Sequence, residues 1–400
     1  MESLKELYKI GSGPSSSHTM GPKKAAEIFA ARCGNADAYR VTLYGSLAAT
    51  GKGHLTDVAI ESVLRPIAPT EICWKPEIIL PFHPNGMLFE GLCAGKVIDE
   101  WTIYSIGGGT LANETSRLNA SASIYPMSNI TEIMAWCSKE GKTYWEYVDE
   151  CEGPEIWAYL DEIWTVMCAT VQRGLNNDGV LPGGLKVARK ASTYLVKAKS
   201  YTDSVSSRAK VYAYALATSE ENAAGGTVVT APTCGSSGVV PAVLYHLVTS
   251  RDFLRIRILR ALATAGLFGN IAKTNSSISG AEVGCQGEVG VACAMAAAAA
   301  CQLFGGTPSQ IEYAAEMALE HHLGLTCDPV CGLVQIPCIE RNAVAAARAL
   351  DANIYATLSD GQHMVSYDKV VAVMNETGHH IPSLYRETSQ GGLAKQYKKR

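Results

Sequence analysis

The chain has 400 residues, of which 47% are hydrophobic and 18% charged, and its formal net charge is −4. This composition is ordinary for a globular protein and excludes an intrinsically disordered chain. The small negative charge gives no electrostatic attraction to nucleic acid or to an anionic membrane, so neither is expected as a partner. The length exceeds what one hydrophobic core usually supports, so two domains are expected.

The N-terminal residues 1–8 are charged and amphipathic and lack the apolar segment of a signal peptide. We therefore expect a cytoplasmic protein whose thirteen cysteines are mostly free thiols. The most apolar run, residues 289–304, is mostly alanine and is shorter than the ~20 residues of a membrane span. It predicts a buried helix whose small side chains let neighbouring backbones approach closely.

Residues 1–137 predict an α+β domain. Short β-prone runs at residues 39–44 and 77–82 alternate with Gly/Pro turns, and residues 20–32 have a helical pattern. Residues 138–400 predict an all-α catalytic domain of buried helices with small residues. Ala- and Leu-rich helical windows recur there at residues 208–218, 241–249, 255–272, 309–323 and 342–351, separated by Gly-rich loops.

Two histidine motifs lie in the first domain. Residues 11–22 read GSGPSSSHTMGP and place four polar side chains and His18 before a predicted helix, where free backbone N–H groups favour a carboxylate. Residues 45–57 read GSLAATGKGHLTD, and His54 in this loop is suited to taking a proton from carbon, with Asp57 to orient it. A serine-rich helix cap and a histidine in a polar loop are the structural alternatives.

Two further loops offer polar groups. The turn at residues 83–86, HPNG, contains Asn85, and the loop at residues 230–238, TAPTCGSSG, offers Thr233, Ser236 and Ser237 near a helix N-terminus. Either loop by itself is equally well explained as a structural turn.

A cysteine-rich segment lies in the second domain. Residues 326–342 read TCDPVCGLVQIPCIERN, with prolines and glycines that predict a loop, and Cys285 lies in another Gly-rich loop. No C-x-x-C pair is present, so the spacing is not that of a zinc finger or a ferredoxin. Spacing alone leaves a metal site and a packed group of thiols both open. If a cluster is held, three thiolates leave one iron open to act as a Lewis acid, whereas four close it.

Eight segments together resemble the iron–sulfur-dependent L-serine dehydratases in their single-chain form. They are GPSSSHTMGP, YGSLAATGKGHLTD, HPNGM, SIGGG, LPGGLK, TAPTCGSSGVVPAVLY, CDPVCGLVQIPCIERNA and VSYDKV, in this order from about residue 11 to 370. The resemblance implies conversion of L-serine to pyruvate and ammonia, and a homo-oligomer, a dimer, is expected with it. It also implies a [4Fe–4S] cluster, with no need for pyridoxal phosphate.

The resemblance assigns site residues position by position. It gives the cluster to Cys285, Cys327 and Cys338, and it makes Cys331 a bystander, because the family commonly has glycine there. His54 is implied as the base that takes the Cα proton, with His18 assisting, so the site is expected between the domains. The residues implied in substrate binding are Ser15, Ser16, Ser17, Thr19, Asn85, Thr233 and Ser236.

Two alternatives remain. The same scaffold is compatible with desulfhydration of L-cysteine or another small amino-acid β-elimination. A non-catalytic small-molecule-binding protein with a structural zinc site is the alternative from another class, with Cys331 as the fourth ligand.

Overall fold

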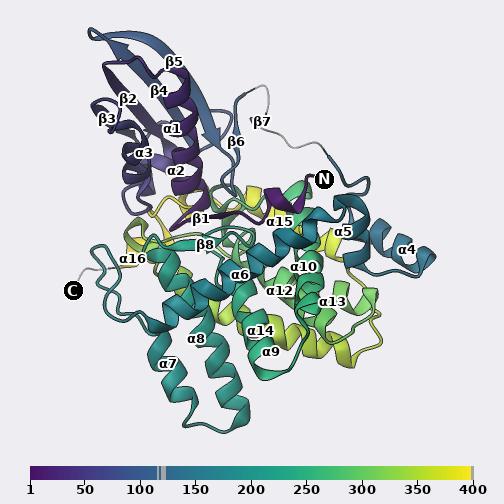
Figure 1. Ribbon diagram of the computed structural model, residues 1–400. Helices are drawn as coiled ribbons and strands as arrows, with labels where there is room; N and C mark the ends of the chain where they lie inside the picture. Colours follow the sequence, from purple (N-terminus) through teal and green to yellow (C-terminus); the bar gives the residue numbers. More distant parts are fainter. Residues whose placement is uncertain (115–116, 119–122, 398–400) are drawn as a thin grey trace.

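The computed structural model describes residues 1–114, 117–118 and 123–397, and these residues form two hydrophobic cores. The smaller core lies under a mixed sheet in the first third of the chain, and the larger core lies among helices (Figure 1). The predicted fold class, an α+β region followed by a largely helical domain, is confirmed. The domain division at residues 137 and 138 stays a prediction.

The sheet has the strand order β3-β2-β4-β5-β6-β7. Its strands are β2 (Ala38–Tyr44), β3 (Thr70–Lys75), β4 (Gly86–Cys93), β5 (Lys96–Ser105), β6 (Leu111–Ala112) and β7 (Arg117–Leu118). β2 runs parallel to β3 and antiparallel to β4, with Val41 opposite Phe89. The helices of this region are α1 (Gly21–Arg32), α2 (Gly45–Thr50) and α3 (Thr56–Leu64). Phe29 of α1 packs against Phe89, with ring centroids 5.5 Å apart, so α1 covers the sheet.

The predicted strand at residues 77–82 is wrong. The strand that pairs with β2 ends at Lys75, and Ile78, Ile79 and Phe82 lie outside the sheet with exposed side chains. Pro76 precedes this run and Pro81 lies within it, and proline has no N–H to give to a sheet ladder. The two prolines were thus better evidence against a strand than the apolar residues were for one.

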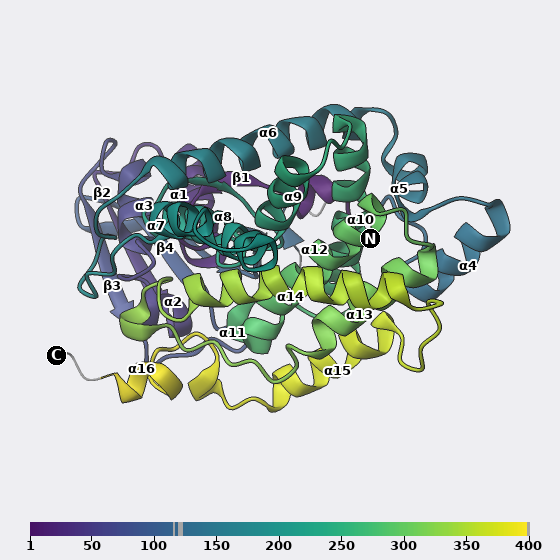
Figure 2. The ribbon, with the colours of Figure 1, turned by 90° about the horizontal axis from the view of Figure 1, so that it is seen from below.

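The helical region is built around α12 (Val289–Leu303), in which every residue except Gln302 is buried. Figure 2 shows α6 along one side of this region and α15 along the other, with α12 and α14 between them. The other helices are α4 (Ile130–Glu140), α5 (Tyr144–Glu152), α6 (Glu155–Asn176), α7 (Ala191–Ala198), α8 (Asp203–Ala223), α9 (Val239–Ser250), α10 (Arg255–Asn275), α11 (Gly280–Val283), α13 (Pro308–Glu320), α14 (Cys338–Leu358), α15 (Tyr367–His380) and α16 (Gly392–Gln396). The expected buried alanine helix is confirmed, because alanine lets α9, α10, α13 and α14 pack close to it.

Among the described residues, no single helix has both the length and the hydrophobicity needed to cross a membrane. The bent pair formed by residues Gly280–Gln286 and Val289–Leu303 meets that test only when the two helices are counted together.

The N-terminal segment belongs to the helical core although it precedes the sheet in sequence. Leu4, Leu7 and Tyr8 are buried there, and the Tyr8 hydroxyl donates to the Leu262 carbonyl at 3.0 Å. β1 (Ile10–Ser12) then pairs antiparallel with β8 (Thr227–Val229), between the sheet and the helices (Figure 1). The chain thus enters the sheet region from the surface of the helical region, and His18 follows directly after this junction.

Candidate functional site

His18 and His54 lie side by side in the first region. Their ring centroids are 4.5 Å apart in an edge-to-face arrangement, and both side chains are buried. His18 belongs to the π-helical turn Ser16–Met20, which is capped by Ser15 and leads into α1. His54 lies in the turn between α2 and α3. The tertiary fold therefore joins the two histidine motifs that the sequence separates by 36 residues.

Both ring nitrogens of His18 have partners. Its Nδ1 lies 2.9 Å from Ser17 Oγ and 3.5 Å from Glu387 Oε1, and its Nε2 lies 3.1 Å from Ser46 Oγ. Burial, together with the neighbouring His54, holds the pKa of His18 well below its usual range. His18 is therefore a neutral imidazole at physiological pH, and neither of its ring nitrogens is free.

His54 has one partnered nitrogen and one free nitrogen. Its Nδ1 lies 3.3 Å from Thr50 Oγ1, whereas its buried Nε2 has no hydrogen-bond partner in the described part of the chain. Burial lowers the pKa of His54 to about 3. The expectation that Asp57 orients this ring is wrong: Asp57 is bound to the Val58 N–H at 2.9 Å, and Thr50 occupies the position next to Nδ1.

The serine-rich turn holds the two histidine loops together. Ser15 Oγ accepts from the His18 N–H at 3.1 Å and lies 3.3 Å from Ser17 Oγ. Thr19 Oγ1 donates to the His54 carbonyl at 2.7 Å, and Ser16 accepts the Gly21 N–H through its carbonyl. These contacts give the turn a structural role in placing the histidines. The substrate-binding role of Ser15, Ser16, Ser17 and Thr19 stays a prediction.

The cysteines come from three segments of the helical region. Cys285 lies in the 3₁₀ turn Gly284–Gln286, Cys327 lies in the loop after α13, and Cys338 is the first residue of α14. The prediction that residues 326–342 are all loop is therefore wrong for the last five. Pro337 immediately precedes the helix instead of interrupting it, and helix starts tolerate proline.

The three thiols influence one another electrostatically. A hydrogen bond from Cys327 and the charge of Arg341 lower the pKa of Cys285 to about 6, against the opposing effect of burial. Burial and the charge of Cys285 raise the pKa of Cys338, so these two thiols lie within electrostatic reach of each other. Arg341 is anchored by the Thr326 carbonyl at 2.6 Å and by Asp328 at 3.3 Å. One thiolate next to a guanidinium is a suitable starting point for binding a metal.

Glu288 stands beside the thiols and was not among the predicted residues. Its Oε2 lies 4.0 Å from Cys285 Sγ and 3.9 Å from Cys327 Sγ, and burial raises its pKa to about 8. Thr233 Oγ1 donates to Glu288 Oε1 at 2.8 Å and lies 3.1 Å from Ser236 Oγ. The loop of Thr233 and Ser236 thus reaches the cysteine site through Glu288. The only signal in the sequence was its place three residues after Cys285.

Glu387 links the histidines to the cysteines, and it too was missed. Its carboxyl group forms a compact group with His18 and His54, with one ligand atom of each within 4.8 Å of the others. Its backbone N–H donates to the Cys327 carbonyl at 2.7 Å, and its carbonyl accepts from Ser46 Oγ at 2.8 Å. Glu387 has a φ of 57°, a left-handed conformation that is uncommon outside glycine and often marks a functional constraint.

The two loops also touch directly at glycines. A Cβ added to Gly53, next to His54, would lie 2.2 Å from the carbonyl oxygen of Gly332 in the cysteine loop. Only glycine allows this approach of two backbones. The loop of His54 and the loop between Cys327 and Cys338 are therefore in direct contact, and a single site shared by the histidines and the cysteines stays a prediction.

The chain matches two known family models. Residues 104–394 match the family model of the serine dehydratase alpha chain, and residues 3–75 match that of the serine dehydratase beta chain. The chain belongs to the serine dehydratase family. It is 42% identical to an L-serine dehydratase of Streptomyces coelicolor, covering 98% of each chain. It is also 42% identical to L-serine dehydratase 1 of Escherichia coli, over 98% of this chain and 99% of that protein. It is 36% identical to an L-serine dehydratase of Helicobacter pylori, and this match covers 99% of each chain.

Cys331 differs from the three cysteines that are predicted to hold a cluster in this member of the serine dehydratase family. It is exposed, and its φ is 56° within the turn Val330–Gly332. A left-handed backbone favours glycine, which agrees with the expectation that relatives have glycine at this position. The geometry therefore agrees with Cys331 as a bystander.

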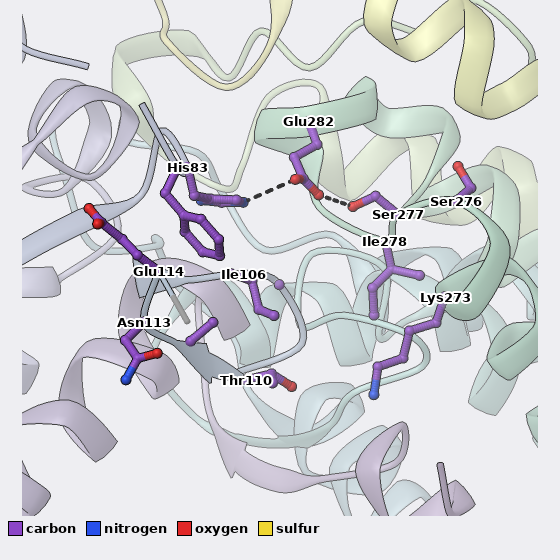
Figure 3. A pocket seen from close by; sticks show the side chains of 13 residues that line it. His83, Ile106, Thr110, Asn113, Glu114, Lys273, Ser276, Ser277, Ile278 and Glu282 are labelled. Atoms are coloured by element: carbon purple, nitrogen blue, oxygen red, sulfur yellow. Dashed lines mark hydrogen bonds and ion pairs between the residues drawn. The ribbon is translucent and has the colours of Figure 1, made fainter. Parts of the chain in front are cut away.

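A cavity of about 380 Å³ lies between the two regions (Figure 3), and its lining residues include neither His18 and His54 nor the cysteines. Figure 3 shows His83 from the sheet region pointing toward Glu282 of α11, with 3.4 Å between His83 Nε2 and Glu282 Oε1. Glu282 also accepts from Ser277, and Lys273 lies across the cavity. Asn85, next to this wall, donates from Nδ2 to the Ser105 carbonyl at 3.2 Å, while its buried Oδ1 has no partner among the described residues. The substrate-binding role of Asn85 stays a prediction.

Proposed function

We propose that this protein removes water and then ammonia from L-serine, giving pyruvate. The observation that carries the proposal is a compact group of Cys285, Cys327 and Glu288, linked through the backbone of Glu387 to a buried imidazole, His54, whose Nε2 is free. Cys338 is within electrostatic reach of Cys285 but is not part of this compact group. The names of the relatives, L-serine dehydratase, support the choice of substrate. An open active-site base opposite a metal-binding set suits elimination of a hydroxyl group from the carbon next to Cα.

The residues present fit a [4Fe–4S] cluster. Cys285 and Cys327 are buried and Cys338 is half-buried; the three thiols share charge effects, and Arg341 compensates negative charge beside them. They would hold the cluster with three ligands, and the cluster would supply a Lewis acid for the substrate carboxylate and hydroxyl oxygens. No pyridoxal phosphate is required, because Lewis-acid activation of the hydroxyl replaces its role.

The protein groups have separate roles in the proposed reaction. His54 Nε2 accepts the Cα proton, the Cα–H electron pair forms the C=C bond, and the C–O bond breaks. The hydroxyl leaves as water with the proton that His54 has taken, which returns the imidazole to its neutral form. The aminoacrylate that results tautomerises to an imine, and its hydrolysis gives pyruvate and ammonia. His18 holds the ring of His54 in place through edge-to-face contact. The unpartnered Asn85 Oδ1 and Glu387 Oε2 accept hydrogen bonds from the substrate ammonium.

Thr233, Ser236 and Glu288 hold the opposite wall of the site. The Thr233 hydroxyl fixes the Glu288 carboxyl at 2.8 Å, and this keeps the carboxyl beside the thiols. Thr233 and Ser236 are buried, and this limits access of water to the reacting atoms from that side. The expected dimer has no assigned part in this mechanism.

The test is anaerobic purification followed by counting of iron and acid-labile sulfide and an assay of keto acid formed from L-serine, L-threonine and L-cysteine. We expect iron and sulfide in equal amounts, a brown colour that air bleaches, and pyruvate from serine as the fastest reaction. Faster turnover of L-cysteine would make the protein a desulfhydrase. Zinc in place of iron, with no turnover, would favour the binding-protein alternative.

A further inference from the structure

Helix α2 (Gly45–Thr50) contacts both histidines, and its two hydroxyl residues contact different rings. Ser46 lies 3.1 Å from Nε2 of His18, and Thr50 lies 3.3 Å from Nδ1 of His54. We propose that Thr50 is a positioning residue that keeps the proton of His54 on Nδ1 and so makes Nε2 the basic atom of the site. This inference rests on the proposed role of His54 as the base.

The argument begins with the single hydrogen of the Thr50 hydroxyl. Thr50 Oγ1 donates it to the Ser46 carbonyl at 3.0 Å, since a carbonyl oxygen can only accept. The same Oγ1 lies 3.3 Å from His54 Nδ1, and with its hydrogen committed it can only accept there. His54 must therefore carry its hydrogen on Nδ1, because the hydrogen bond made by one ring nitrogen sets the state of the other.

The other nitrogen is left as a bare lone pair. His54 Nε2 is buried and has no hydrogen-bond partner in residues 1–114, 117–118 and 123–397. A buried polar atom without a partner is costly and calls for a functional explanation. The lowered pKa of His54, caused by burial, keeps the ring neutral and agrees with a lone pair that is available to a substrate proton.

His18 has the opposite arrangement for the same reason. Ser46 Oγ donates to the Glu387 carbonyl at 2.8 Å, so it accepts from His18 Nε2. His18 Nδ1 then accepts from Ser17 Oγ at 2.9 Å, and neither nitrogen is free. Ser46 and Thr50, one turn apart on α2, therefore contact the two histidines differently. His18 has no free ring nitrogen, whereas His54 has a bare Nε2, so the proton transfer is assigned to His54 and not to His18.

The first test compares Thr50→Val with Thr50→Ser. Valine keeps the shape of threonine but offers His54 Nδ1 no acceptor, so part of the population shifts its hydrogen to Nε2. We expect kcat for serine to fall about 10–100-fold, as for other groups that orient a functional histidine, with little change in KM. Thr50→Ser keeps the hydroxyl and should restore most of the activity.

The matched control is Thr170→Val in α6 (Glu155–Asn176). Thr170 is a buried helical threonine whose hydroxyl also donates to the carbonyl four residues earlier, at 2.9 Å, but it lies outside the site. This variant should lose a similar contribution to stability and keep the kcat of the wild type. A drop in kcat that equals the drop in Thr50→Val would show that the effect is only structural, and it would overturn the inference.

The second test observes the nitrogens themselves. In protein labelled with ¹⁵N-histidine, a protonated and a bare ring nitrogen have clearly different ¹⁵N chemical shifts, and His54→Gln assigns the signals. We expect Nδ1–H with bare Nε2 in the wild type and a mixture in Thr50→Val. A wild-type ring protonated on Nε2 would refute the inference even if Thr50→Val failed to fold.

The two proposals fail separately. If the protein forms no pyruvate from serine but His54 carries its hydrogen on Nδ1, the proposed function falls and the assignment of the bare nitrogen stands. If serine is converted but Thr50→Val has the kcat and the spectrum of the wild type, Thr50 has no positioning role and the function is unaffected.

Discussion

The two halves of the site are stabilised in different ways. In the helical region, ionisable groups contact one another: Cys285 meets Cys327, Arg341 and Glu288. In the sheet region, the histidines meet mainly neutral hydroxyls, those of Ser17, Ser46 and Thr50. A metal site needs thiolates, which a guanidinium stabilises, whereas a base needs a neutral imidazole, which burial among hydroxyls provides. The helical half therefore favours ionised thiols, and the sheet half favours neutral imidazoles.

The largest effect should come from removing a thiol. Cys327→Ala deletes a proposed cluster ligand in the centre of the group, so we expect loss of the brown colour, of iron and sulfide, and of all measurable turnover. The measurement is the visible spectrum and the metal content of anaerobic protein. Cys331→Gly is the matched control, because Cys331 is exposed and its φ of 56° suits glycine. An active Cys327→Ala, or a colourless Cys331→Gly, would show that the ligands are wrongly assigned.

Removal of the base should separate the two halves. His54→Gln leaves the thiols untouched, so we expect turnover to fall about 10²–10⁴-fold while colour and iron content remain. His321→Gln, at an exposed position directly after α13, is the control. A colourless His54→Gln would mean that the histidine half also holds the cluster, and the contrast between the halves would fail.

A smaller effect is expected where the halves meet. Glu387→Gln keeps the shape of the side chain and the backbone contacts to Cys327 and Ser46 but removes the carboxyl group proposed for the substrate ammonium. Burial, together with Glu288 and Cys285, raises the pKa of Glu387, and the ammonium would favour its ionised form. We expect kcat/KM to fall about 10–100-fold, the cost of one charged hydrogen bond. L-Glycerate, which has a hydroxyl in place of the ammonium, should inhibit the variant and the wild type equally. Exposed Glu376→Gln is the control, and an unchanged kcat/KM in Glu387→Gln would remove Glu387 from the substrate contacts.

The smallest effect concerns stability and pH. The pKa of His54 is about 3 when folded and ordinarily 6.5, so between these values the unfolded chain binds more protons. The free energy of unfolding should therefore fall as the pH drops below 6.5, by up to about 1.4 kcal/mol per pH unit for this group, and stay constant above it. Urea unfolding at pH 5.0 and 7.5 checks this. His54→Gln should lose less stability on acidification than the wild type, and equal losses would contradict a neutral, buried His54.

Local sequence patterns were reliable where one feature dominates. The alanine run at residues 289–304 gave a buried helix, and the alternating residues 39–44 gave a strand, because side-chain size and period act within a few residues. The predicted strand at residues 77–82 was wrong because prolines in and before this run prevent strand pairing. The predicted loop was wrong at Cys338, where a helix starts directly after Pro337. The expectation that Asp57 orients the ring of His54 was also wrong, because closeness in sequence does not place a carboxylate beside the ring.

The sequence by itself determined the fold class, the family motifs and the residue types of the site. The cysteines, histidines, serines and threonines of the site all occur in unusual loop motifs of the sequence. Only the tertiary structure decided that Glu387 lies between His18 and Cys327, that Glu288 stands beside two thiols, and that Thr50 contacts His54. Glu387 follows His18 by more than 360 residues. Such contacts depend on how two cores pack against each other, and no local periodicity in the chain records that packing.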